Sequence, residues 1–150
     1  MITYTVEAWD DIKDEVKPLL QRHWEEVALD RDTIPLAVDW DSYDVLAAQG
    51  VLHLLIARKD GVMIGYYWAI VRTHLHYVET LFAFTDILFI EKQHRRGMVG
   101  VNLFREMERT LKELGVQKIF AATKTKLDLG PIFKRLGYTV HEVVYSKMIG

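Results

Sequence analysis

Three long apolar stretches follow one another in the middle of the chain, at residues 51–57, 62–71 and 78–90, with only short polar segments between them. They are rich in β-branched and aromatic residues, which favour strands. The first two are joined by Lys59-Asp60-Gly61, a turn of the Asp-Gly kind that is typical of tight hairpins. Connections this short leave no room for a crossover helix, so the sequence predicts an antiparallel meander at the centre of the fold.

The segments on either side of the meander complete the predicted fold. The apolar spacing predicts a strand at 2–8, helices at about 11–28 and 41–48, a helix at 98–114, a strand at 117–123, a short helix at 127–136 and a last strand at 138–148. The second half alternates strands with helices, which requires right-handed crossovers and parallel pairing in part of the sheet. We therefore expect an α/β (α+β mixed) fold, a single domain over residues 1–150 whose mostly antiparallel sheet carries helices on both faces.

Composition excludes several classes of protein. The chain of 150 residues contains no cysteine, so disulfides, thiolate metal sites and a cysteine nucleophile are excluded. The apolar stretches have the length of strands and are broken by polar residues, so no membrane span is expected. The N-terminus lacks a basic region followed by an apolar run, so no signal peptide is expected. These features favour a cytoplasmic protein.

Charge is distributed unevenly along the chain. Residues 1–60 carry thirteen Asp and Glu against six Lys and Arg, whereas residues 91–126 carry four Glu against nine Lys and Arg. The basic segment favours an anionic ligand, although a solvated helix face is the competing explanation. Nucleic acid is disfavoured as a partner, because the chain has a pI near 6.3 and no long basic run.

The strongest local signal is a strand, a charged turn and a helix start at residues 86–104. Unpaired N–H groups at a helix N-terminus attract anions, and glycine lets a phosphate approach the backbone closely. Arg95, Arg96, Gly97 and Gly100 have this chemistry, although a loose turn before a helix is the alternative. No Gly-Lys-Ser/Thr follows, which excludes a Walker loop, and the three-glycine Rossmann pattern is missing.

This segment resembles the coenzyme A-binding motif of the GNAT (Gcn5-related N-acetyltransferase) superfamily. In that family a strand ending in Leu-x-Val is followed, five residues on, by Arg/Gln-x-x-Gly-x-Gly/Ala, and Ile90 to Arg95 has this spacing. The order of elements matches over nearly the full chain, and residues 133–138 are similar to the family's Tyr-Glu-Lys-Leu-Gly-Phe. The sequence departs from the family at Met98, where a glycine is usual, and at Phe133, where many members have a tyrosine.

The resemblance implies acetyl-coenzyme A (acetyl-CoA) as co-substrate and no metal. It implies that Leu88, Phe89 and Ile90 lie against the pantetheine arm, with the Ile90 N–H as donor to the thioester carbonyl. The other residues to which it assigns cofactor contacts are Arg95, Arg96, Gly97, Met98, Val99, Gly100 and Phe133. Lys126 stands where an asparagine common in the family is absent, and it is a candidate contact for the anionic cofactor, with a solvated side chain as the alternative.

Direct acyl transfer to an amine also needs a general base and favours a general acid. Asp86 interrupts an apolar run and shares a side of its strand with Leu88 and Ile90 by simple alternation. Apolar surroundings would raise the pKa of its carboxyl, as a base near neutral pH requires. Glu79 is the second candidate base. A base acting through water and a structural role for Asp86 are the alternatives.

Several further residues have both a functional and a structural interpretation. Tyr138 and Tyr145 are candidate replacements for the general acid, with sheet packing as the alternative. His74 and His76 share a face, but no third metal ligand is evident. The aromatic residues expected either to line an acceptor pocket or to fill the core are Trp24, Trp40, Tyr43 and Trp68.

The predicted function is N-acetyl transfer from acetyl-CoA to a primary amine of a small molecule or peptide. The alternatives are a catalytically impaired GNAT-fold binding or regulatory protein, and a nucleic-acid-directed protein that uses the basic surface of residues 92–126. A homodimer is expected by analogy with the family. The acceptor itself is not determined by the fold.

Overall fold

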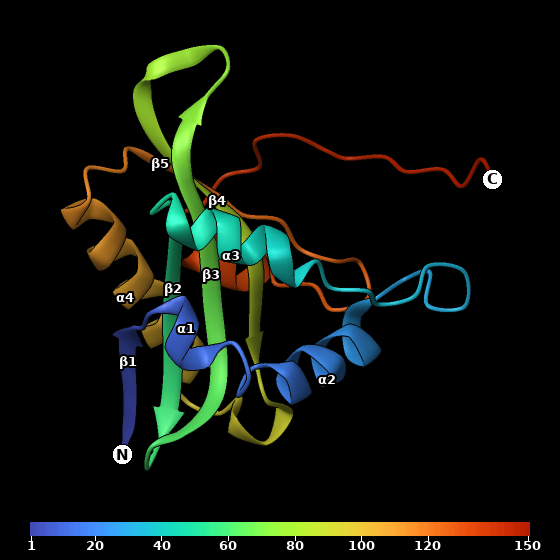
Figure 1. Cartoon of the computed structure of the whole chain (residues 1–150), viewed down its shortest axis with the longest axis horizontal. Coiled ribbons are helices and arrows are strands. Elements are labelled where there is room, and N and C mark those ends of the chain that lie inside the picture. Colours follow the sequence, from blue (N-terminus) through green and yellow to red (C-terminus); the bar gives the residue numbers. More distant parts are fainter.

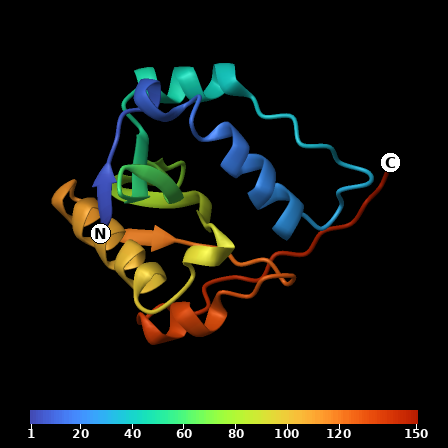
Figure 2. The same ribbon diagram turned by 90° about the horizontal axis from the view of Figure 1, so that it is seen from below.

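The computed structural model describes residues 1–150, which build a single sheet with helices on both of its faces (Figures 1 and 2). The strand order is β1-β2-β3-β4-β5, and neighbours are antiparallel except for the parallel pair β4 and β5. The predicted fold class is thereby confirmed. The elements are β1 (Ile2–Val6), α1 (Trp9–Ile12), α2 (Lys17–Val27), α3 (Trp40–Ala48), β2 (Leu52–Lys59), β3 (Val62–His74), β4 (Tyr77–Ile90), the 3-10 helix η1 (Lys92–His94), α4 (Val99–Glu113), β5 (Lys118–Phe120) and α5 (Gly130–Arg135).

The predicted β2–β3 hairpin is confirmed. Lys59 pairs with Val62, and the two turn residues, Asp60 and Gly61, have φ values of 50° and 85°. Both values lie in the left-handed region. Two-residue turns need this conformation if their twist is to match that of the paired strands. The Asp-Gly sequence therefore determines both the position and the type of this turn.

Each face of the sheet carries its own apolar core. Alternate residues of β2 and β3 point to opposite faces, so that Leu54 and Trp68 enter one core while Leu55 and Tyr67 enter the other. Helices α1, α2 and α3 cover the first face, and α4 and α5 cover the second (Figure 2). No helix combines the length and apolar character that crossing a membrane requires.

A β-bulge interrupts β4 at Asp86. Trp68 of β3 pairs with Ile87, and the next residue, Ala69, pairs with Thr85, so that Asp86 has no partner in the ladder. An extra residue of this kind shifts the alternation of the strand by one position. Before the bulge the odd-numbered residues of β4, such as Ala83, therefore face the α4–α5 side of the sheet. After the bulge the even-numbered residues, Leu88 and Ile90, face that side.

Strands β4 and β5 diverge after a short parallel contact, and we call the gap between them the fork. Pairing extends only from Phe82 with Lys118 to Phe84 with Phe120. Residues 85–90 of β4 consequently have β3 on one side and no strand on the other. Backbone groups that point into the fork are free to bind a ligand, because no ladder uses them.

Gly65 allows β3 to approach the end of β4 closely. A Cβ at this position would lie 2.6 Å from the Phe89 carbonyl oxygen and 3.0 Å from Ile90 Cα. Both are backbone atoms that move only with the strand. We expect Gly65→Ala to lower the free energy of unfolding by about 3 kcal/mol, as measured by urea denaturation. Gly100→Ala is the control, because its added Cβ would meet only Ile90 Cδ1, at 3.9 Å; equal losses for the two variants would contradict this explanation.

Three elements depart from their predicted ranges. The helix expected at 11–28 is divided into α1 and α2, because Pro18 lies in the first turn of α2 and has no N–H to continue a helix from α1. The strand expected at 117–123 is confined to β5, Lys118–Phe120. The short helix expected at 127–136 begins later, at Gly130.

The last strand, predicted at 138–148, is wrong. Residues 138–150 form no helix and no strand, and they run away from the sheet (Figure 1). The apolar pattern of Val140, Val143 and Tyr145 is that of a strand, but these residues do not pair with the edge strand β5.

Candidate active site

The turn between β4 and α4 offers unpaired backbone donors. Gly97 has a φ of 58°, a conformation that glycine adopts readily, and α4 begins at Val99 without a side-chain cap. The N–H groups of the turn and of the first turn of α4 that find no acceptor in the chain are those of Arg96, Gly97, Met98, Gly100 and Val101. Together with the helix dipole, these groups form an electropositive concavity suited to a phosphate.

The two arginines of the turn have different environments. Arg95 is half-buried: its Nε donates to the Ile90 carbonyl over 2.7 Å and its Nη2 to Glu26 over 2.7 Å. Its guanidinium also lies 5.3 Å from the centre of the Phe89 ring. Hydrogen bonding from Arg95 lowers the pKa of the Glu26 carboxyl. Arg95 thus ties the end of β4 to α2, whereas Arg96 is exposed and forms no ion pair.

The Ile90 N–H points into the fork. Glu91 N–H donates to the Ile64 carbonyl over 2.8 Å, and the adjacent pair is Gly65 with Ile90. Hydrogen-bonded and non-bonded pairs alternate in an antiparallel ladder, so the Ile90 backbone groups turn away from β3. The carbonyl is occupied by Arg95, which leaves the N–H as a free donor. The side chain of Ile90, like that of Leu88, packs on the α4 side, and Phe89 packs on the α2 side.

Asp86 differs from its expected setting in two respects. The bulge places its carboxylate on the α1–α3 side, where it accepts a hydrogen bond from the Tyr43 hydroxyl, so the predicted shared side with Leu88 and Ile90 is wrong. Its side chain is exposed, so the expected apolar burial is also wrong. Burial, and then the bond to Asp86, raises the pKa of Tyr43, which keeps this phenol a neutral donor. A base role for Asp86 stays a prediction.

Glu79 lies apart from the fork, and Lys126 lies on the loop that follows β5. Glu79 is exposed in the part of β4 that forms the projecting β3–β4 hairpin (Figure 1). Asp86 lies seven positions further along the strand, roughly 23 Å away along an extended chain. Lys126 is exposed in a tight turn closed by the bridge between Lys124 and Leu127. The structure therefore does not bring Glu79 together with Asp86.

Phe133 is a core residue in this structure. Its side chain is 9% exposed and packs edge-on against Phe104, with ring centres 5.5 Å apart, and beside Tyr138. A cofactor contact for Phe133 stays a prediction. The Tyr138 hydroxyl is buried without a hydrogen-bond partner, and burial raises its pKa. Tyr145, the other candidate acid, is 91% exposed on the C-terminal segment, away from the fork (Figure 1).

A pair of hydroxyl groups beside the bulge was missed by the sequence analysis. Tyr67 and Thr85 share a hydrogen bond of 2.9 Å between their side-chain oxygens. Burial raises the pKa of Tyr67 to about 12, and the neighbouring Thr85 and Tyr138 hydroxyl groups oppose this increase. Glu26 was also missed, because it is 69 residues from Arg95. The position of Thr85 next to Asp86 was the only local signal for this group.

The aromatic residues near Asp86 form a packed cluster. Trp9 lies at its centre, with ring centres 5.1 Å from Tyr43 and 5.6 Å from Trp68. Trp68 is fully buried and belongs to the core, whereas Trp40 and Tyr43 are half-buried at its rim. Of these residues, Tyr43 contacts Asp86 through its hydroxyl. Trp24 is half-buried on α2.

His23 lies against the other side of the β4 end. Its ring stacks on Phe89 with centres 4.8 Å apart, and its Nδ1 is 2.7 Å from the Tyr66 hydroxyl. Burial lowers the pKa of His23 to about 4, against an opposing effect of Glu26. This histidine is consequently neutral in the folded protein at neutral pH.

The His23 environment predicts acid lability. Below the ordinary histidine pKa of 6.5 the unfolded chain binds a proton that the folded chain binds only near pH 4, so stability falls as pH falls through this window. Urea unfolding at about pH 7 and about pH 5 should show a loss on the order of 2 kcal/mol. His23→Phe should reduce this pH dependence, and part should remain because burial also lowers the pKa of His53. If the free energy of unfolding depended on pH as strongly in His23→Phe as in the wild-type protein, groups other than His23 would cause the acid lability.

The sequence matches the model of the acetyltransferase (GNAT) family over residues 9–138. The chain therefore belongs to this family, and the resemblance predicted from the turn is confirmed. Membership supports acetyl transfer as the general activity and acetyl-CoA as co-substrate. No curated protein sequence matches the chain significantly.

Several solved structures share the fold. An aminoglycoside acetyltransferase from an uncultured soil metagenomic sample, in complex with trehalose, superposes with a TM-score of 0.75 at 16% identity, over 99% of this chain and 95% of that chain. A predicted acetyltransferase with acetyl-CoA from Clostridium acetobutylicum gives 0.71 at 15% identity, over 99% and 96%. Ribosomal-protein-alanine N-acetyltransferase from Brucella melitensis biovar Abortus 2308 gives 0.73 at 17% identity, over 100% of both chains. At these identities the likeness establishes the fold alone.

Proposed function

We propose that this protein transfers the acetyl group of acetyl-CoA directly to a primary amine. The observation that carries the proposal is the fork, whose open β4 edge leads to the free N–H groups at the start of α4. The open edge suits the extended thioester chain of the co-substrate, and the free N–H groups beyond it suit the pyrophosphate at the other end of that chain. The family match supports the same co-substrate.

Each part of the co-substrate has a proposed partner. The amides of Gly97, Met98 and Gly100 bind the pyrophosphate, and Arg96 adds a full charge beside it. Residues 88–90 flank the pantetheine arm along the fork. The free Ile90 N–H donates to the thioester carbonyl and stabilises the oxyanion that forms there.

In the proposed chemical step a protonated acceptor amine loses two protons, one before and one after its attack. Asp86 takes the first proton directly or through water, the amine nitrogen forms a bond to the acetyl carbon, the bond from that carbon to sulfur breaks, and the second proton passes from the nitrogen to solvent. Tyr43 holds the carboxylate in position. The departing thiolate takes a proton from Tyr138 or from solvent. Glu79 is the alternative base.

The acceptor is proposed to be a cationic amine on a small molecule or a peptide. Residues 1–60, which include the α1–α3 side of the sheet beside Asp86, carry thirteen Asp and Glu against six Lys and Arg. This excess of negative charge attracts protonated amines. The aminoglycoside and ribosomal-protein acetyltransferases that share the fold are consistent with either kind of acceptor.

The basic character of residues 92–126 is reduced by internal pairing. Arg109 on α4 donates to Glu106 and to Glu113, so its charge is balanced on the helix itself. This pairing favours cofactor binding near the turn over an extended nucleic-acid surface, for which unpaired cations are needed.

Two measurements test the proposal in sequence. Acetyl-CoA should raise the melting temperature in a concentration-dependent manner, and absence of any shift at millimolar concentration would contradict the co-substrate assignment. Release of free thiol should then depend on an added amine, tested with a panel that spans polyamines, aminoglycosides and peptides. A thermal shift without amine-dependent release would instead support the binding or regulatory alternative.

A further inference from the structure

Three phenylalanines lie together where β4 meets β5, and we call Phe82, Phe84 and Phe120 the phenylalanine group. Phe84 pairs with Phe120 between the two parallel strands, and their rings stack with centres 5.4 Å apart and planes 8° apart. The ring centre of Phe82 lies 5.6 Å from that of Phe120 and 6.0 Å from that of Phe84. None of the three belongs to the apolar core on either face of the sheet. They form an aromatic cluster of their own, outside the packing of the helices.

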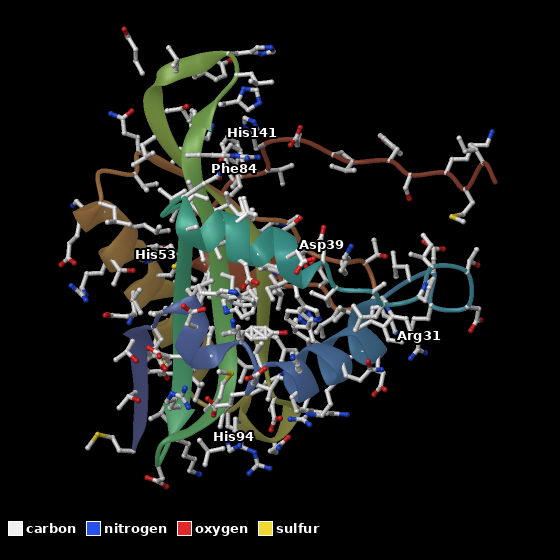
Figure 3. The ribbon with its side chains drawn as sticks, viewed as in Figure 1. Arg31, Asp39, His53, Phe84, His94 and His141 are labelled. Carbon is white, nitrogen blue, oxygen red and sulfur yellow. The ribbon has the colours of Figure 1, made fainter.

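The two stacked rings of the group are only partly covered. Phe84 and Phe120 are half-buried. Their neighbours are two histidines: the ring of His74 on β3 lies 6.3 Å from Phe84, and the ring of His141 lies 4.9 Å from Phe120. His141 belongs to the C-terminal arm, residues 139–150, all of which are exposed. Figure 3 shows Phe84 and His141 together, on the side of α3 from which the β3–β4 hairpin projects. A further aromatic ring can therefore make edge-to-face or offset contacts with both phenylalanines.

The phenylalanine group lies on the same side of the sheet as the carboxylate of Asp86. Phe84 pairs with Ile70 of β3, which is two residues from Trp68 of the α1–α3 core. Paired residues, and alternate residues of one strand, share a face, so Phe84 faces that core's side. The bulge turns Asp86 to this side as well, where its carboxylate accepts from Tyr43. Asp86 lies two positions beyond Phe84, roughly 7 Å along an extended strand.

Positive charge borders the phenylalanine group on the side away from Asp86. Arg72 of β3 and Lys118 of β5 are the two strand partners of Phe82, and Lys118 Nζ lies 5.1 Å from the centre of the Phe120 ring. Both cations are exposed, and neither forms an ion pair with a carboxylate. They repel a second ammonium group on a ligand and leave a neutral ring unaffected. Along one face the surface thus changes from a carboxylate to aromatic rings and then to cations.

We propose that the acceptor is a small arylalkylamine, whose amine lies at Asp86 and whose ring lies on Phe84 and Phe120. The hydrogen bond from the amine to the carboxylate takes up about 3 Å of the separation between them. A linker of two carbon atoms between the nitrogen and the ring covers the rest. Two uncovered rings bounded by Arg72 and Lys118 suit one ligand ring, and therefore a small molecule. This inference rests on the proposed acetyl transfer and narrows its acceptor to a monoamine with an aromatic ring.

Matched amines test whether the ring is recognised as an aromatic group. Phenethylamine and cyclohexylethylamine have the same linker and a ring of similar size, so the comparison isolates the aromatic character of the ring. The wild-type protein should acetylate phenethylamine with a kcat/KM about tenfold higher than cyclohexylethylamine, because contacts between aromatic rings contribute beyond the area that they bury. The kcat/KM for spermidine should be lower still. Equal values for the two ring amines, or a preference for spermidine or for a peptide N-terminus, would overturn the proposal.

Phe84→Leu and Phe120→Leu test the two rings separately. Each variant should lower the ratio of kcat/KM for phenethylamine to that for cyclohexylethylamine by about threefold or more, the contribution of one aromatic pair. The KM for acetyl-CoA and the thermal shift that acetyl-CoA produces should persist, which shows that the variants fold. Tyr77→Leu is the matched control, because Tyr77 is an aromatic residue of β4 that is 59% exposed and lies outside the phenylalanine group. An unchanged ratio in both phenylalanine variants would overturn the proposal.

Ligand NMR separates failure of this inference from failure of the proposed function, because it does not depend on turnover. In the presence of coenzyme A, the ring protons of phenethylamine should receive saturation from the wild-type protein, and less of it from Phe84→Leu. If these signals behave as expected while no amine is acetylated, the aromatic site stands and the proposed acetyl transfer falls. Absence of saturation transfer to the ring in the wild-type protein overturns the inference, even if other amines are acetylated. A change of oligomeric state in Phe84→Leu with unaltered ring signals would also overturn it, and would assign the phenylalanine group to contact with a second copy.

Discussion

Replacing Gly100 with glutamate is expected to abolish stabilisation by acetyl-CoA while the protein stays folded. Gly100 occupies the first turn of α4, where a new Cβ meets only Ile90 Cδ1, at 3.9 Å. A carboxylate there interacts favourably with the helix dipole, by roughly 0.5 kcal/mol. The same charge repels a pyrophosphate bound to the neighbouring amides. The dissociation constant for acetyl-CoA should rise on the order of 100-fold, as measured by calorimetry.

Gly100→Ala is the matched control for this variant. It adds the Cβ without the charge, so it should keep most of the affinity. Loss of binding in both variants would indicate that space rather than charge is decisive at this position. Full binding by Gly100→Glu would place the pyrophosphate elsewhere.

Asp86→Asn is expected to lower kcat for amine acetylation by about 100-fold or more, the usual contribution of a positioned general base. The amide oxygen can still accept from the Tyr43 hydroxyl, so the rim of the aromatic cluster should keep its geometry. The KM for acetyl-CoA should change little, because Asp86 faces α3 and not the pyrophosphate turn.

Two further substitutions provide a control for this prediction and a test of the alternative base. Asp41→Asn removes an exposed carboxylate from the first turn of α3 and should leave turnover unchanged. Glu79→Gln tests the other candidate base on the projecting hairpin. Normal turnover in Asp86→Asn together with lost turnover in Glu79→Gln would reverse the assignment.

Local patterns in the sequence were sufficient for most of the fold. The Asp60-Gly61 turn and the apolar stretches around it gave the meander, and the spacing from Ile90 to Gly100 located the start of α4. These features depend on residues that are neighbours along the chain. The predicted parallel pairing was also found, between β4 and β5.

The site details depend on contacts between distant segments, which a single sequence does not reveal. Arg95 was expected to bind anions, but Glu26 of α2 holds it in place. Asp86 was expected to be buried, because simple alternation takes no account of a bulge. The last strand was predicted from its apolar pattern alone, which is also the pattern of the exposed arm.

The bulge at Asp86 also reverses, within β4, the side of the sheet that odd-numbered and even-numbered residues face. Before the bulge, Ala83 faces the α4–α5 core, and after it Leu88 and Ile90 face the same core. The side chains that face the α4–α5 core therefore change from odd to even positions within a single strand, while the odd positions after the bulge, Ile87 and Phe89, pack on the α1–α3 side. Deletion of one residue at the bulge would remove this change, so that Leu88 and Ile90 would turn to the opposite face of the sheet, and it would separate the carboxylate from Tyr43.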